Sequence, residues 1–172
     1  MNWTRTAALS AALALALGTA AQAQDSDTIQ TFTKADFTQA LDAVGATYDV
    51  HDDRRNIDIS FGNGLKADGL LMACDDNETE SNCYGTSILA TFSAPTGADD
   101  ASIAKAIGEY NYRENFGRAY LDPEGTISVR MYIISDGGIV RENYSRQIEL
   151  WATSLGDFIG YLYPEEDGEE GT

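Results

Sequence analysis

The sequence is poor in the residues from which most metal and catalytic sites are built. It has one histidine and two cysteines among 172 residues, which excludes most zinc sites and triads made with several such side chains. Positive charge is scarce as well: 11 Lys and Arg residues stand against 28 Asp and Glu residues, a net charge of −17. DNA, RNA and anionic membrane surfaces attract cationic proteins, so we expect no nucleic-acid partner.

Motifs that mark common enzyme classes are missing too. There is no Gly-x-Ser-x-Gly elbow and no Walker loop, and Gly62-Asn63-Gly64 lacks the third glycine of a dinucleotide-binding fingerprint. His51 stands in a turn-rich stretch of Asp and Arg residues with no nucleophile placed beside it. We therefore predict a protein that is not an enzyme, with no catalytic residue, no metal site and no cofactor.

The chain does contain enough apolar sequence for one folded domain. Hydrophobic residues make up 43% of it and aromatic residues 10%, which is too much for an intrinsically disordered chain. The length is that of a single domain with short tails.

The N-terminus has the pattern of a secretory signal peptide, residues 1–23. Arg5 precedes an Ala- and Leu-rich stretch from Ala7 to Leu17, and Ala21-Gln22-Ala23 is a small-x-small cleavage site. Cleavage after Ala23 removes Arg5 and no acid, so the net charge changes from −17 to −18. We predict a periplasmic or secreted protein with no stable membrane insertion after cleavage; an uncleaved N-terminal anchor is the alternative.

The only two cysteines, Cys74 and Cys83, flank a polar stretch between two apolar, strand-like segments. In an oxidising compartment this pattern predicts a hairpin closed by a disulfide. A redox pair is the alternative, although CxxC spacing and a cationic neighbour are absent. The loop carries four acids that offer a second alternative, a weak Ca²⁺ site: Asp75, Asp76, Glu78 and Glu80.

Hydrophobic periodicity predicts an α+β domain with an antiparallel sheet of about five to six strands and three helices on one face, in the order α-β-β-β-β-α-β-β-α. Thr33 and Asp36 form a capping-box pattern at the first helix. The last helix has the strongest apolar stripe. We expect helices at about 34–44, from Asp99-Asp100 and from Val140, and strands at 47–50, 57–61, 65–74, 84–93, 118–122 and 126–134. Residues 24–32 are predicted as a polar tail, 33–163 as the domain and 164–172 as an acidic tail.

The segment Glu109–Asp122 is unusually rich in aromatic, Arg and Asn residues. Tyr and Arg anchor many protein interfaces, so the segment is a candidate partner surface. The alternative is a packing corner in which Gly117 supplies an unusual backbone angle. The candidate surface consists of Tyr110, Asn111, Arg113, Asn115, Arg118 and Tyr120.

Over the same segment the chain resembles the YbjN domain family. The resemblance rests on Phe116–Asp122, the strand at 126–134, Gly137-Gly138, and a helix with a central Trp151. It implies a type III secretion chaperone-like fold that is often dimeric, a loosely defined regulatory or stress-tolerance role, and no enzyme activity. The signal peptide and the cysteine pair are similar to those of an exported branch.

Together these features predict a non-catalytic exported module that binds an unidentified protein or peptide in the cell envelope, with a homodimer among the expected assemblies. The alternative is a small periplasmic hydrolase that uses paired carboxylates. A deep pocket that gathers two or more acids with His51 would favour the hydrolase.

Overall fold

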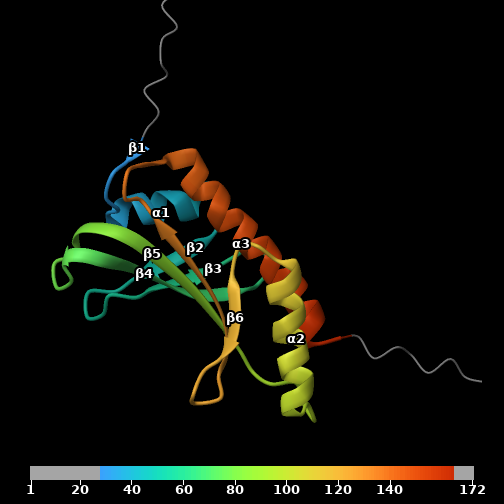
Figure 1. Cartoon of the computed structure of the whole chain (residues 1–172). Coiled ribbons are helices and arrows are strands. Elements are labelled where there is room, and N and C mark those ends of the chain that lie inside the picture. The colour runs from blue at the N-terminus through green and yellow to red at the C-terminus, as the bar shows by residue number, and fades with distance from the viewer. Residues whose placement is uncertain (1–27, 165–172) are drawn as a thin grey trace, which may run out of the picture.

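The computed structural model describes residues 28–164 as one layer of sheet covered by one layer of helices (Figure 1). The elements in chain order are β1 (Thr28–Ile29), α1 (Lys34–Ala43), β2 (Thr47–Val50), β3 (Ile57–Ser60), β4 (Lys66–Asp76), β5 (Ser81–Phe92), α2 (Asp100–Arg113), β6 (Arg118–Leu121), β7 (Ile127–Ile134), β8 (Ile139–Val140) and α3 (Arg141–Leu162). The predicted signal peptide lies outside the described residues.

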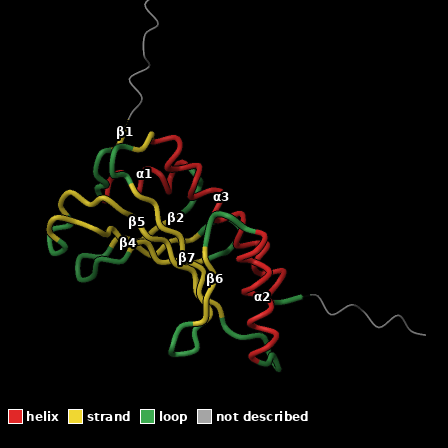
Figure 2. Tube along the Cα trace, viewed as in Figure 1, coloured by secondary structure: helices red, strands yellow, loops and turns green. Residues whose placement is uncertain are grey.

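The main sheet has six antiparallel strands in the order β2-β3-β4-β5-β7-β6. The predicted α+β class, the three helices and the order of the long elements are confirmed. Figure 2 shows the helices gathered on one side of the sheet and no helix on the other side. The sheet therefore has an inner face against the helices and an open face.

The inner face follows the period-two pattern of the strands. Ile57 and Ile59 of β3 are buried, and so are Val129, Met131 and Ile133 of β7. The last helix turns its predicted stripe onto this face, with buried Tyr144, Ile148, Trp151, Leu155, Phe158 and Leu162.

Gly69 of β4 lets α1 lie close to the sheet. A Cβ atom built on Gly69 would lie 2.8 Å from the Phe37 ring and 2.9 Å from Ile59. The N-terminus of α1 is held by the predicted capping box, in which Thr33 and Asp36 bond to each other's backbone N–H.

The predicted polar tail at 24–32 is wrong for its described part. Thr28–Ile29 forms β1, which pairs with β8, and Ile29 and Phe32 are buried. Phe32 packs against Tyr144 of α3, with ring centroids 4.6 Å apart. A strand of two residues is too short to show a hydrophobic period, so nothing in the sequence indicated that Ile29 is buried.

Candidate binding surface

The structure divides the six predicted surface residues among a packing corner, the exposed end of α2 with the loop that follows it, and the open face of the sheet. Tyr110 is wrong as a surface residue, since its side chain is 0% exposed. It lies edge-on to Phe158, and its hydroxyl is 2.9 Å from Oγ of Ser154 on α3. Burial raises the pKa of the Tyr110 phenol. Tyr110 therefore joins α2 to α3.

Asn111 is exposed but already used by the fold. Its side-chain amide donates to the carbonyl of Ala119 and accepts from the Ala119 N–H, both at 2.9 Å. These two bonds fasten β6 to the end of α2. Asn111 therefore acts as a clamp within the domain.

Gly117 completes the corner, for a reason other than the one predicted. Its φ is not in the left-handed region, so the predicted unusual backbone angle is wrong. A Cβ at this position would lie 2.5 Å from the Tyr110 hydroxyl and 3.0 Å from the Trp151 ring. Gly117 is needed for space.

Arg113 and Asn115 lie at the end of α2 and in the loop that follows. Arg113 donates to Glu109 at 2.8 Å on the exposed side of the helix. Asn115 is exposed and lines a cavity of about 270 Å³ beside Arg118 and Arg130. Of the six residues, only Arg118 and Tyr120 contribute side chains to the open face.

The open face carries every second residue of the strands, opposite to those in the core. The side chains that define it are Asp49 of β2, Asp58 and Ser60 of β3, Lys66, Asp68, Leu70 and Met72 of β4, Ser87, Leu89 and Thr91 of β5, Ser128, Arg130, Tyr132 and Ile134 of β7, and Arg118 and Tyr120 of β6.

Charge is separated along one row that crosses all six strands. Cross-strand partners place residues of one row side by side on one face. From β2 to β6 the row reads Asp49, Asp58, Asp68, Leu89, Arg130, Arg118. One half of the row is acidic and the other half is basic, with a leucine between them.

Arg130 is held in place by two tyrosines. Its guanidinium carbon lies 5.6 Å from the centroid of the Tyr120 ring and 5.7 Å from that of Tyr132, and Nη1 donates to the Tyr132 hydroxyl at 2.8 Å. Its buried Nε atom has no hydrogen-bond partner. Within residues 28–164 no carboxylate pairs with Arg130 or Arg118. This end of the row is an ordered cationic surface without a counter-charge.

At the acidic end, the β2–β3 turn folds back onto Asp58. Arg54 and His51 both contact its Oδ2, and the hydrogen bond from Arg54 holds the pKa of the Asp58 carboxyl below its usual value. Asp49 and Asp68 make no side-chain hydrogen bond or ion pair within the described part of the chain.

The cavity beside these acids does not meet the condition set for a hydrolase. It has a volume of about 290 Å³ and is lined by Asp49, Asp58, Asp68 and Lys66, among others, but His51 does not line it. The histidine contacts Asp58 and Arg54 at the rim. The histidine therefore lies outside the group of acids that lines the cavity.

Apolar side chains lie beside the charged row. Met72 and Ile134 approach each other over Gly85, since a Cβ there would lie 3.1 Å from one and 3.2 Å from the other. Tyr132 is 52% exposed and Ile134 is 57% exposed. The pairing of β6 with β7 ends at Arg118 and Arg130, so Tyr132 and Ile134 of β7 have no partner strand on that side among residues 28–164.

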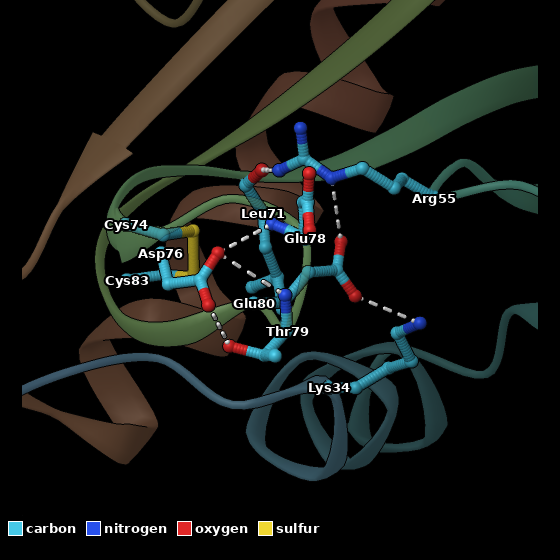
Figure 3. Close-up of polar contacts among 9 residues, drawn as sticks. All are labelled: Lys34, Arg55, Leu71, Cys74, Asp76, Glu78, Thr79, Glu80 and Cys83. Carbon is cyan, nitrogen blue, oxygen red and sulfur yellow. Dashed lines mark hydrogen bonds and ion pairs between the residues drawn. A yellow bond between two sulfur atoms is a disulfide. The ribbon is translucent and has the colours of Figure 1, made fainter.

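The disulfide hairpin forms a separate structure at the far ends of β4 and β5 (Figure 3). Cys74 and Cys83 are cross-strand partners, and their sulfur atoms are bonded at 2.05 Å, so the predicted disulfide is present.

The acids of this hairpin point in different directions rather than toward one centre. Glu80 accepts ion pairs from Lys34 at 2.8 Å and from Arg55 at 3.2 Å. Asp76 caps the turn through Glu78 and Thr79, and its hydrogen bond with the Thr79 hydroxyl is the main cause of its lowered pKa. Asp75 bonds to Asn82.

No three His, Cys, Asp or Glu side chains of the described chain gather as a metal site would require. Glu80 does not extend freely into solvent, because its side chain is only 9% exposed. Glu80 instead ties the hairpin to α1 and to the β2–β3 turn.

The part of the chain that the structure describes has no helix with both the length and the apolar character needed to cross a bilayer.

The charged row was missed by sequence reasoning, although its residues were all visible. Asp68 and Arg130 are 62 positions apart, and only the register of three strands places them in one row. The alternation of Arg130, Tyr132 and Ile134 with buried residues was the available signal, because it assigns these three to the outer face.

Comparison with known proteins identifies the family. The YbjN family, described as "Putative bacterial sensory transduction regulator", matches residues 33–163. The structure is similar to that of YbjN from E. coli, described as "a putative transcription regulator", with a TM-score of 0.59 and 13% identity over 77% of this chain and 91% of that one. A chain of the HopA1-SchA chaperone–effector complex is similar with a TM-score of 0.44 and 13% identity, over 72% of this chain and 87% of that one.

No curated protein matches the sequence. The family match spans most of the chain, and the likeness to E. coli YbjN agrees in fold. The family is described as a regulator and not as an enzyme. The resemblance seen in the sequence is confirmed, and the chain belongs to the YbjN family.

Proposed function

We propose that this YbjN-family protein is an exported, non-catalytic regulator of the cell envelope that binds a protein or peptide on the open face of its sheet. The observation that carries the proposal is the composition of that face. Arginine, tyrosine and exposed apolar side chains stand together on a rigid sheet that no other described element covers. Tyr and Arg are enriched among the residues that dominate binding energy at interfaces.

Export is supported by the signal-peptide pattern and by the disulfide, since disulfides persist in oxidising compartments. We expect the protein recovered from the periplasm or medium to have the intact mass of residues 24–172 with one disulfide. A mass that retains Met1–Ala23 would contradict cleavage, and two free thiols would contradict the bridge.

Site-specific photo-crosslinking tests the binding surface directly. A benzophenone amino acid replaces Tyr132 on the open face, and a matched variant carries it at Tyr112, which is 86% exposed on α2. We expect ultraviolet light in living cells to give discrete crosslinked bands for the Tyr132 variant and not for the Tyr112 variant. Equal crosslinking at both positions, or none at Tyr132, would contradict the assignment of the surface.

A further inference from the structure

We propose that the open face binds a second copy of this chain, so that two sheets pack face to face about a two-fold axis running along β5. This inference rests on the proposed function, because it uses the same open face. It identifies the protein that binds there as a second copy of the chain. Three properties of the face support it: its charge, its apolar residues and the size of the side chains on the axis.

When two copies of the charged row face each other in opposite directions, the acidic half of one lies against the basic half of the other. A two-fold axis along β5 places the β4 side of one copy opposite the β7 side of the other. Asp68 then faces Arg130 of the second copy, Asp58 faces Arg118, and the two Leu89 side chains meet at the axis. Each of the two ion pairs occurs twice, as off-axis contacts do in any isologous interface.

Asp68, Arg130 and Arg118 have no ion-pair partner among residues 28–164, whereas Asp58 already contacts Arg54 and His51 of its own chain. Leu89 separates Asp68 from Arg130, and strands two positions apart lie about 10 Å from each other. The Arg130 guanidinium is turned to Tyr132 instead, while Asp68 has no side-chain partner in residues 28–164. A second copy supplies the missing counter-charges.

The apolar residues follow the same symmetry. In the next two rows, Leu70 and Met72 of β4 lie across β5 from Tyr132 and Ile134 of β7. Reversal of the rows therefore places Leu70 opposite Tyr132 and Met72 opposite Ile134. On the axis, β5 contributes Gly85, Ser87 and Thr91 besides Leu89, and these small side chains allow the close approach of two sheets, which pack about 10 Å apart.

The size of the face indicates a reversible dimer. Four rows about 7 Å apart on the five strands that overlap, about 5 Å apart, cover roughly 400 Å² in projection. Standard interfaces bury about 800 Å² on each partner, and smaller ones belong to weak or transient complexes, so we expect a dimer that dissociates on dilution. The net charge of −18 expected for the mature chain opposes association. Salt near 0.15 M gives a Debye length of about 8 Å and screens this repulsion more than it weakens the close ion pairs.

Charge reversal tests the proposal, with sedimentation velocity of the oxidised mature protein at up to about 0.5 mM as the measurement. We expect the wild type to dimerise, and Arg130→Asp and Asp68→Arg each to be at least tenfold weaker. An equimolar mixture of the two variants restores the dimer, because each variant carries the charges that the other needs. The double variant Asp68→Arg/Arg130→Asp restores it as well.

Matched controls make the same charge changes away from the face. Arg146→Asp and Asp157→Arg lie on exposed positions of α3, and we expect both to dimerise like the wild type. Circular dichroism confirms the fold of each variant; if Arg130→Asp does not fold, Leu89→Lys, which sets two lysines against each other at the axis, replaces it with the same expected loss.

Two results overturn the inference: a wild type that stays monomeric up to the highest concentration, or a mixture of variants that fails to associate although the wild type does. A monomer whose Tyr132 photo-crosslinks to a different protein removes the second copy as partner and leaves the proposed function standing. A monomer without crosslinks at Tyr132 removes both.

Discussion

Gly117 allows α2 and α3 to pack closely because it has no Cβ atom. The Tyr110 hydroxyl and the Trp151 ring occupy the space where a Cβ would be. Both side chains are fully buried and belong to different helices, so neither can move away without opening the core.

We therefore expect Gly117→Ala to lower the free energy of unfolding by about 1–3 kcal/mol, the usual cost of overpacking. Gly108→Ala is the matched control, because nothing lies within 4 Å of its Cβ position in α2, and it should raise stability by about 0.5–1 kcal/mol. Urea unfolding measures both. Equal effects of the two substitutions would show that close packing at Gly117 is unimportant.

Asp36 links the start of α1 to the start of α3. Burial alone would raise the pKa of its carboxyl, but hydrogen bonds from Thr33 and Arg141 outweigh burial and lower the pKa. The Arg141 Nη2 atom lies 2.9 Å from its Oδ1. Because the pKa is lower in the folded than in the unfolded state, the stabilisation is complete above the usual carboxyl value near 4 and is lost as the pH falls through the folded-state value.

Asp36→Asn should thus cost about 1–2 kcal/mol at pH 7 and less at pH 2.5. The free energy of unfolding measured across this pH range gives the difference between variant and wild type. Asp53→Asn, in the exposed β2–β3 turn, serves as the control and should leave the pH profile unchanged. A difference that stays constant with pH would contradict the role of the ionised carboxylate.

At the scale of elements, the disulfide hairpin depends on its covalent link and on Glu80 together. The loop closed by Cys74 and Cys83 has about ten residues, and closure of such a loop stabilises a fold by roughly 2.5–3 kcal/mol on the chain-entropy model. The ion pairs of Glu80 with Lys34 and Arg55 then hold the hairpin against the domain.

We expect the Cys74→Ala/Cys83→Ala variant to lose about 2–3 kcal/mol. Thermal unfolding with and without reductant provides the check: reductant should lower the Tm of the wild type and leave that of the double variant unchanged. A variant as stable as the oxidised wild type would show that the bridge contributes nothing.

The elements with a clear hydrophobic period were predictable from the sequence, and their register was not. The stripe from Tyr144 to Leu162 specified α3, and alternation specified β3 and β7. The same helical period placed Tyr110 in line with Ile103, which argues for burial, so the mistake there came from weighing residue type above periodicity. The row from Asp49 to Arg118 depends on five strand pairings, none of which local sequence determines.

The whole molecule is strongly acidic, but its charge is unevenly placed. Five of the 28 acids follow Pro164, whereas the half of the open face at β6 and β7 carries two arginines without acidic partners in the described chain. Net repulsion of this size disfavours the compact state and is screened by salt.

The Arg130→Asp variant is used here because it is expected to stay monomeric. We expect its Tm to rise by about 2–5 °C between 10 and 300 mM NaCl. The same variant ended at Pro164 lacks five acids and should show a smaller rise. Scanning calorimetry at several salt concentrations measures both, and a Tm that falls with salt would show that local ion pairs outweigh net repulsion.

The pairing of β1 with β8 affects when the chain can fold during its synthesis. Thr28 meets Val140 across 112 positions of chain, and β5 receives its second neighbour only when β7 has been made. A chain that emerges from the ribosome N-terminus first therefore lacks the partners of its earliest strands until most of it is present. We expect the fold to be completed only after β7 and β8 have been made. This delay suits the export proposed above, because a threading translocase accepts unfolded chains.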